Sequence, residues 1–300
     1  MVIACHNEAA YIRESVESVL AQTVPASEIV VVDDGSTDDT AGIVRSIPGV
    51  ALASLERGGV SVARNHGWRS TSGEFVIFHD ADDRLLPNAI EAGLDAFALR
   101  AECGFVYGFA GFIDASGASI GTVHAARRVT NANYEFLLAG SPPAPASAVM
   151  FRRAALEAVD GFRVGQELAQ DVDLYLRVAR SFPVFCHEVT ITEYRRHKSN
   201  SSARSPSRTL RACHATLERQ RPEIRDEPRL VAALEEGKHY FNSILGEPVA
   251  HEMFGLLRAG RMRKALGVLP VALRYAPRPL LRVSVHYVRR LPAIAINAFR

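Results

Sequence analysis

The chain has 300 residues, of which 48% are hydrophobic and 23% charged, values that are ordinary for a globular protein of one or two domains. Its four cysteines, Cys5, Cys103, Cys186 and Cys213, lie far apart, which excludes the spacing of a zinc site and the density of a disulfide scaffold. No apolar run reaches the roughly 18 to 20 residues that span a bilayer, and the N-terminus lacks the charged and then apolar pattern of a signal peptide. We therefore expect a cytoplasmic protein.

The formal net charge of +2 conceals an uneven distribution of charge along the chain. Residues 203–300 carry 18 Lys and Arg against 8 Asp and Glu, whereas residues 1–202 carry 17 against 25. From Met253 to Arg300 there are ten basic residues and no acidic one. We expect the acidic part to hold a metal ion and the basic part to face a negatively charged partner.

Predicted strands and helices alternate through the first 115 residues. The strands are expected at residues 1–5, 29–32, 50–55, 75–78 and 105–113, and the helices at 11–21, 60–68 and 87–99, with a further helix that Thr37 or Asp38 caps and that ends at Val44. The β-branched run Ile29–Val32 is typical of a strand that is buried on both faces of a parallel sheet. The alternation predicts a doubly wound α/β fold.

The strand at 75–78 leads directly into three carboxylates, Asp80, Asp82 and Asp83. Burying such a cluster is costly unless a positive group lies among its members. Because ligands bind at the carboxyl ends of strands in an open α/β sheet, we expect the three carboxylates to line a cleft there. Oxygen ligands of this kind suit Mg²⁺ or Mn²⁺ that arrives with a phosphate group, although the same residues alone would also fit a solvated acidic turn.

The sequence after residue 115 is less regular. Strands are predicted at 147–151 and 189–194 and helices at 154–159 and from Gln170 onward, with a turn at 114–117 and a proline-rich loop at 141–145. A basic stretch, Arg195–Ser201, follows the last strand, and the chain beyond Ser202 is predicted to be helical. Residues 258–266 look like the turn and second helix of a helical hairpin, but one copy does not make a repeat array.

Several short motifs occur in a fixed order within residues 1–202. They are Asn7-Glu8, Asp33–Asp38, Gly59–Gly67, Ser72–Glu74, Asp80–Asp83, Gly161-Phe162, Gln170-Asp171 and Arg195–His197. In this order and at these spacings, the motifs resemble those of the family 2 glycosyltransferases, which have the GT-A fold. The resemblance implies a Rossmann-like, doubly wound mixed sheet over residues 1–202, followed by a C-terminal helical extension.

The resemblance also implies an activity and a set of site residues. Family members transfer a sugar from a nucleotide-diphosphate donor to an acceptor hydroxyl with inversion and use Mg²⁺ or Mn²⁺; we expect UDP as the nucleotide. The implied general base is Asp171, and the implied metal ligands are Asp82 and His197. The implied nucleotide-sugar-binding residues are His6, Asn7, Glu8, Asp34, Arg64 and Asp80, with Asp34 accepting a hydrogen bond from the base and Arg64 holding diphosphate or pairing with an Asp of the cluster.

Other interpretations of these residues stay open at the level of sequence. Asp171 would also serve as a helix cap, and Arg64 with Asn65 would also tie a helix to the sheet. Two positions depart from the family pattern: His6 stands where an aromatic ring is usual, and Gln170 replaces the usual Glu. A different class of function, a catalytically silent nucleotide-sugar-binding or scaffold protein, remains the alternative. A nucleotidyltransferase is disfavoured, because residues 5–10 contain neither Gly nor Lys or Arg.

The predicted domains are a glycosyltransferase domain at 1–202 and a basic helical extension at 203–300. Within the first, residues 1–115 form the nucleotide-binding half and 116–202 the acceptor and base half. Arginines and apolar residues interleave in the extension, so we expect it to lie against an anionic membrane surface, with a soluble helical face or a dimer contact as alternatives. No nucleic-acid-reading motif accompanies the charge. The expected acceptor is a glycan or a lipid-linked molecule of polysaccharide, glycolipid or cell-envelope synthesis.

Overall fold

The computed structural model describes residues 1–122, 132–140, 145–197, 200 and 205–289. Most of the predicted proline-rich loop and most of residues 198–204 lie outside this part of the chain. Contacts between residues divide the chain into two compact units, one made of residues 1–137 and 141–197 and the other of residues 138–140 and 198–300. The domain boundary that the sequence predicts at residue 202 stays a prediction.

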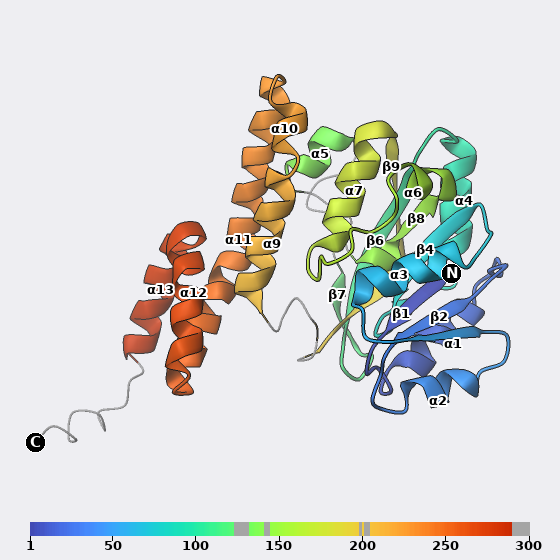
Figure 1. The fold of residues 1–300 in the computed structure, drawn as a ribbon, viewed down its shortest axis with the longest axis horizontal. Coiled ribbons are helices and arrows are strands. Elements are labelled where there is room, and N and C mark those ends of the chain that lie inside the picture. The colour runs from blue at the N-terminus through green and yellow to red at the C-terminus, as the bar shows by residue number, and fades with distance from the viewer. Residues whose placement is uncertain (123–131, 141–144, 198–199, 201–204, 290–300) are drawn as a thin grey trace, which may run out of the picture. The chain divides into compact units, whose positions relative to one another are not determined.

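The first unit is built on a mixed β-sheet (Figure 1). The strands are β1 (Val2–Cys5), β2 (Val30–Asp34), β3 (Ala51–Leu55), β4 (Phe75–Asp80), β5 (Arg84–Leu85), β6 (Phe105–Asp114), β7 (Ser119–Thr122), β8 (Val149–Arg152) and β9 (Val184–Arg196). Their order is β3-β2-β1-β4-β8-β6-β9-β5, and β7 pairs with β6. Strands β3, β2, β1 and β4 run parallel, so their carboxyl ends lie at one edge of the sheet.

Helices cover both faces of the parallel part of this sheet. The helices of the first unit are α1 (Ile12–Leu20), α2 (Thr40–Arg45), α3 (Val60–Arg69), α4 (Ala89–Leu99), α5 (Tyr134–Leu138), α6 (Arg153–Ala158) and α7 (Gln170–Ser181). Val31 of β2 packs in one core cluster with apolar residues of α1 and α2, whereas its neighbours Val30 and Val32 pack with Ala63 of α3. Because successive residues of a strand point to opposite faces, this alternation is that of a doubly wound sheet, as predicted.

The part of the sheet beyond β4, where parallel and antiparallel pairs mix, differs most from the sequence prediction. Strand β9 begins at Val184 and has 13 residues, whereas the sequence predicts a strand only at 189–194. Glu188 has a φ of 56°, and the pairing of β6 with β9 shifts in register next to Phe109. This bulge interrupts the alternation of side chains, so the sequence pattern shows only the second half of the strand. The two-residue strand β5 and the strand β7 were not predicted.

The second unit is helical, as predicted. Its helices are α9 (Pro206–Glu218), α10 (Arg221–Ile224), α11 (Pro228–Arg258), α12 (Met262–Tyr275) and α13 (Pro277–Arg289). The long helix α11 contacts α9, α12 and α13. Gly260, with a φ of 69°, makes the turn between α11 and α12 at the position where the sequence predicts a helical hairpin. Among the described helices, none has the length and apolar character needed to cross a membrane.

Candidate active site

The parallel strands bring the predicted site residues to one edge of the sheet. His6 follows the end of β1, Asp34 ends β2, and Asp80 ends β4. In the sheet register Asp80 lies beside Ala4, and Asp33 lies beside Cys5. One strand separates β2 from β4, so these two strands lie about 10 Å apart, twice the spacing of neighbouring strands, and Asp34 lies two residues further along the sheet than Asp80.

Asp34 anchors the loop that precedes α3. Its buried carboxylate accepts hydrogen bonds from the backbone N–H groups of Gly58, at 2.7 Å, and Gly59, at 2.9 Å. Arg57 lies 3.2 Å from the same carboxylate. Gly35 has a φ of 69°, and a Cβ there would lie 3.0 Å from the backbone nitrogen of Arg57, so the close approach of the two loops favours glycine. That Asp34 also contacts a nucleotide base stays a prediction.

The predicted contacts at the end of β1 are held against the loop after β2. The side-chain Nδ1 of His6 lies 3.0 Å from the carbonyl oxygen of Asp34 and donates to it in the tautomer that is protonated at Nδ1. Asn7, with a φ of 58°, accepts a hydrogen bond from the backbone N–H of Thr37 at 2.7 Å. The backbone N–H of Glu8 donates to the hydroxyl of Thr40 at 2.9 Å. The two loops therefore form one hydrogen-bonded unit at the sheet edge.

Arg64 is a buried cation between two predicted site carboxylates. Its Nη2 lies 2.5 Å from Oδ1 of Asp80, and the carboxylates of Asp80 and Asp171 both raise the pKa of Arg64 against the effect of its burial. The other two nitrogens, Nε and Nη1, are buried and have no described hydrogen-bond partner. Asn65, the next residue, makes two hydrogen bonds with the backbone of Phe162 and so ties α3 to the 161–162 turn.

Asp82 and His197 meet although 115 positions separate them in the sequence. The Nε2 of His197 lies 2.8 Å from Oδ2 of Asp82, and the imidazole packs on the ring of Tyr11 with 4.8 Å between ring centroids. Burial and the neighbouring Asp80 raise the pKa of Asp82, and the contact with His197 opposes this rise. Both predicted metal ligands therefore lie side by side after β4 and β9.

Asp83 does not join these carboxylates, contrary to the expectation that all three line a cleft. It is fully buried, and its two oxygens accept hydrogen bonds from the hydroxyl of Ser147, at 2.8 Å, and the backbone N–H of Arg195, at 2.9 Å. Burial and then the charges of Asp80 and Asp82 raise its pKa well above the ordinary range of a carboxyl group. Its donors lie on η1 (Ala146–Ala148) and β9, so Asp83 fixes the turn after β4 from inside the protein.

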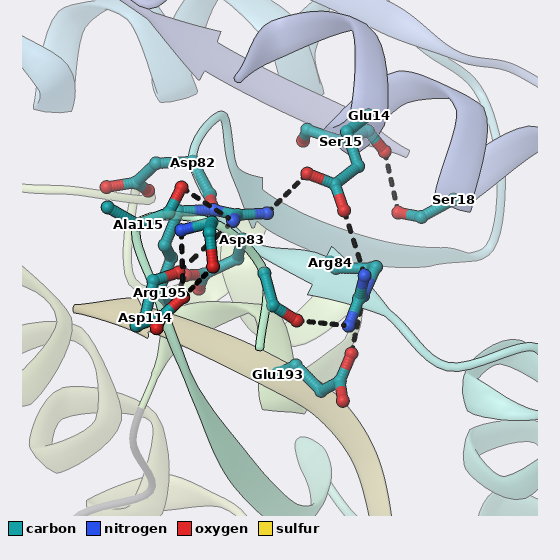
Figure 2. Close-up of polar contacts among 12 residues, drawn as sticks. Glu14, Ser15, Ser18, Asp82, Asp83, Arg84, Asp114, Ala115, Glu193 and Arg195 are labelled. Atoms are coloured by element: carbon teal, nitrogen blue, oxygen red, sulfur yellow. Dashed lines mark hydrogen bonds and ion pairs between the residues drawn. The ribbon is translucent and has the colours of Figure 1, made fainter. Parts of the chain in front are cut away.

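Arg195 connects this turn to α1, and no role was predicted for it (Figure 2). Its Nε donates to the carbonyl oxygen of Asp82 at 2.7 Å, and its Nη2 pairs with Glu14 at 2.5 Å. Arg84 pairs with the second oxygen of Glu14 at 2.9 Å and with Glu193 at 2.5 Å. Figure 2 shows these side chains as one chain of ion pairs behind the turn. The only sequence signal was the Arg195–His197 motif itself, from which only His197 was given a role.

Asp171 is the second residue of α7. Its Oδ1 accepts a hydrogen bond from the backbone N–H of Val172 at 2.9 Å, but the N-cap is Ala169 and no described side chain caps the helix, so Asp171 is not the helix cap that the sequence also allowed. Burial raises the pKa of Asp171, while the N–H of Val172 and the charge of Arg64 oppose the rise. The Tyr175 hydroxyl, one turn further along α7, is buried and has no described partner. From the sequence, Tyr175 was expected only as part of the apolar stripe of this helix.

The residues at this site fit a divalent metal only if a substrate supplies further ligands. Among the described residues, no group of three or more His, Cys, Asp or Glu side chains is arranged to hold an ion. Asp82 and His197 provide an oxygen and a nitrogen 2.8 Å apart. Two neighbouring ligands of an octahedral ion, each about 2.1 Å from it, are about 3 Å apart, so the spacing of the pair matches two neighbouring positions of such a site. An ion held there would need oxygens from a bound phosphate group.

Comparison with known proteins assigns the chain to one family through its first 160 residues. A sequence model described as Glycosyl transferase family 2 matches residues 1–160. "Uncharacterized glycosyltransferase YibD" from Escherichia coli K12 is 37% identical over 95 residues, which cover 30% of this chain and 28% of that protein. Chondroitin synthase from Escherichia coli is 30% identical over 192 residues, which cover 60% of this chain and 26% of that protein. The aligned segments are therefore about a quarter of the length of these relatives.

Solved structures share the fold at low sequence identity. S. aureus TarS 1–349 in complex with UDP-GlcNAc has a TM-score of 0.59 and 17% identity, covering 91% of this chain and 90% of that chain. Mannosyltransferase PcManGT from Pyrobaculum calidifontis, in complex with GDP-Man and Mn²⁺, has a TM-score of 0.59 and 19% identity, covering 95% and 85%. The fold is of the GT-A type, as predicted.

Proposed function

Because this chain belongs to glycosyl transferase family 2, we propose that it moves a sugar from a nucleotide-diphosphate donor to an acceptor hydroxyl. The observation that supports this most strongly is the position of Arg64, which pairs with Asp80 at the end of β4 and interacts with Asp171 at the start of α7. A single buried cation thus joins the predicted donor side of the site to the predicted base.

On the donor side, Asp82 and His197 would hold Mg²⁺ or Mn²⁺ together with the diphosphate. When bound, the ion would stabilise the negative charge on the departing nucleoside diphosphate. The nitrogens Nε and Nη1 of Arg64, which have no described partner, are further donors for negatively charged oxygens. His6, Asn7, Glu8 and Asp34 would contact the nucleotide from the loops after β1 and β2.

On the acceptor side, Asp171 would take the proton of the attacking hydroxyl. The acceptor oxygen bonds to the anomeric carbon as the bond from that carbon to the diphosphate breaks, so one displacement inverts the configuration. Burial raises the pKa of Asp171, which makes its carboxylate a stronger base. Arg64 limits that rise because it favours the charged form.

The donor and acceptor are proposed from the relatives. UDP is the proposed nucleotide, in keeping with the UDP-GlcNAc bound to TarS, although PcManGT binds GDP-Man. The proposed acceptor is a glycan or a lipid-linked molecule of polysaccharide or cell-envelope synthesis, and one relative is a chondroitin synthase. The proposed location is the cytoplasmic face of a membrane, to which the protein would bind peripherally.

A thermal-shift panel of UDP, GDP and dTDP, each with and without Mn²⁺, tests the proposal. We expect one nucleotide to raise the melting temperature, and Mn²⁺ to enlarge the rise, because a ligand stabilises the state that it binds. A rise that does not depend on the metal would contradict the assignment of Asp82 and His197. Binding of the sugar nucleotide with Mn²⁺, but no turnover with any acceptor or with water, would favour the silent binding protein instead.

A further inference from the structure

Helix α12 has an exposed apolar stripe along one side. Met262, Leu266 and Leu273 are 57%, 58% and 57% exposed. Their spacings of four and seven residues place them on the same side of a helix. The buried residues of α12, Ala265, Val268, Val271 and Ala272, occupy other directions around the axis. The stripe is therefore additional to the apolar face with which α12 packs in the second unit.

Helix α13 repeats this arrangement. Leu281 and Val285, one turn apart, are 70% and 51% exposed. The beginning of the helix packs on α11, because a Cβ at Gly246 would lie 3.1 Å from Pro279 and 3.2 Å from Ala276. Pro279 lies roughly 160° around the helix axis from Leu281, since two residues advance about 200°. The exposed pair therefore points away from the contact with α11.

Arginines border both stripes. Exposed arginines directly follow stripe residues on both helices; they are Arg263 and Arg274 on α12 and Arg282 on α13, with Arg278 one turn before Arg282. Among the described residues, Arg263 and Arg278 have no ion-pair partner, whereas Arg282 pairs with Glu247 at 3.8 Å. No Asp or Glu occurs from Met253 to the end of the chain. Apart from Arg282, the border arginines are thus not neutralised by an acidic side chain among the described residues.

We infer that α12 and α13 bind the surface of an anionic phospholipid membrane, with the five stripe residues inserted among the lipids and the arginines on the phosphate groups. A helix with a bulky apolar stripe beside a basic border lies in the interface plane of such a membrane. A second copy of this chain fits less well, because a two-fold interface would place the basic borders opposite each other. The inference deepens the peripheral location proposed above and does not depend on the transfer chemistry.

Sedimentation of the full chain with lipid vesicles tests the inference. One vesicle type contains phosphatidylcholine alone, and the other contains equal parts of phosphatidylcholine and phosphatidylglycerol. The charge variant combines Arg263→Gln and Arg278→Gln, and the apolar variant combines Leu266→Ser and Leu281→Ser. Matched controls remove exposed residues elsewhere, with Arg45→Gln and Arg211→Gln for charge and Leu99→Ser and Val164→Ser for apolar area.

We expect the wild type and both controls to sediment with the anionic vesicles and to bind the phosphatidylcholine vesicles only weakly. The charge variant should bind roughly tenfold to thirtyfold more weakly, since each basic residue near an anionic surface contributes about a factor of five. Equal binding by wild type and variants, equal binding to both vesicle types, or no binding by the wild type would overturn the inference. A thermal shift with UDP and Mn²⁺ on the same variants shows separately whether the nucleotide site is intact.

Discussion

At the scale of single residues, a substitution of Asp171 separates nucleotide binding from sugar transfer. Changing Asp171→Asn keeps the size of the side chain and the hydrogen bond from Val172 but removes the proton acceptor. We expect nucleotide affinity within about threefold of the wild type and a fall in kcat of about 10²- to 10⁴-fold, the usual contribution of a positioned base. Nucleotide titration and initial rates on the same preparation measure both. A variant with full turnover would show that the proton leaves by another route.

The same residue predicts a pH dependence. Only ionised Asp171 accepts a proton, and burial raises its pKa above the ordinary value of about 3.9. The group therefore stays protonated, and inactive as a base, to a higher pH than a solvated Asp. We expect kcat to fall with decreasing pH through this raised value and to recover above it. This decrease of kcat at low pH should be absent from the residual activity of Asp171→Asn. A decrease that persists in the variant would belong to another titrating group.

The residues around the two predicted metal ligands, Asp82 and His197, show what the sequence could not predict. Asp82 and His197 were predicted from motifs, but the motifs do not distinguish Asp82, which meets His197, from Asp83, which points into the interior. The difference depends on Ser147 and on the backbone of Arg195, both distant in sequence. Tertiary partners of this kind leave no local pattern, because each ion pair joins segments whose proximity only the fold establishes.

At the scale of elements, strands buried on both faces were the most predictable. The strand β2 was expected, because β-branched residues run through Ile29–Val32 without interruption. Prediction failed where the backbone departs from regular geometry, as at the bulge beside Glu188 in β9. It also failed for β5, whose two residues are too few to show a period.

Helix α11 offers a stability test within one element. A Cβ at Gly237 would overlap the backbone carbonyl oxygen of Leu138, which cannot move as easily as a side-chain end. We expect Gly237→Ala to lower the free energy of unfolding by about 1–3 kcal/mol, as overpacking does. In the same helix, a Cβ at Gly255 would meet no atom within 4 Å. Gly255→Ala should therefore raise the free energy of unfolding by about 0.5–1 kcal/mol, because Ala has the higher helix propensity.

Urea denaturation followed by circular dichroism measures both changes. The two glycines share a helix, so the comparison separates packing from propensity. If Gly237→Ala were as stable as Gly255→Ala, the close contact between α11 and the chain at Leu138 would be wrong.

At the scale of the whole molecule, the parallel strand order explains why a site could be expected from sequence. The motifs after β1, β2 and β4 follow strands whose carboxyl ends share one edge, so their convergence follows from topology. The charge is also distributed unevenly along the chain. The acidic part contains the predicted site residues, and the basic part contains the exposed stripes of α12 and α13.

The most direct test of the proposed chemistry is a calorimetric titration of UDP into the protein with and without Mn²⁺. For the wild type, and for a control with Asp95→Asn on the exposed side of α4, we expect Mn²⁺ to tighten binding by at least about tenfold. For Asp82→Asn, the affinity with Mn²⁺ should fall to the metal-free value. An Asp82→Asn protein that still gains the full effect of Mn²⁺ would contradict the assignment of the metal to Asp82 and His197.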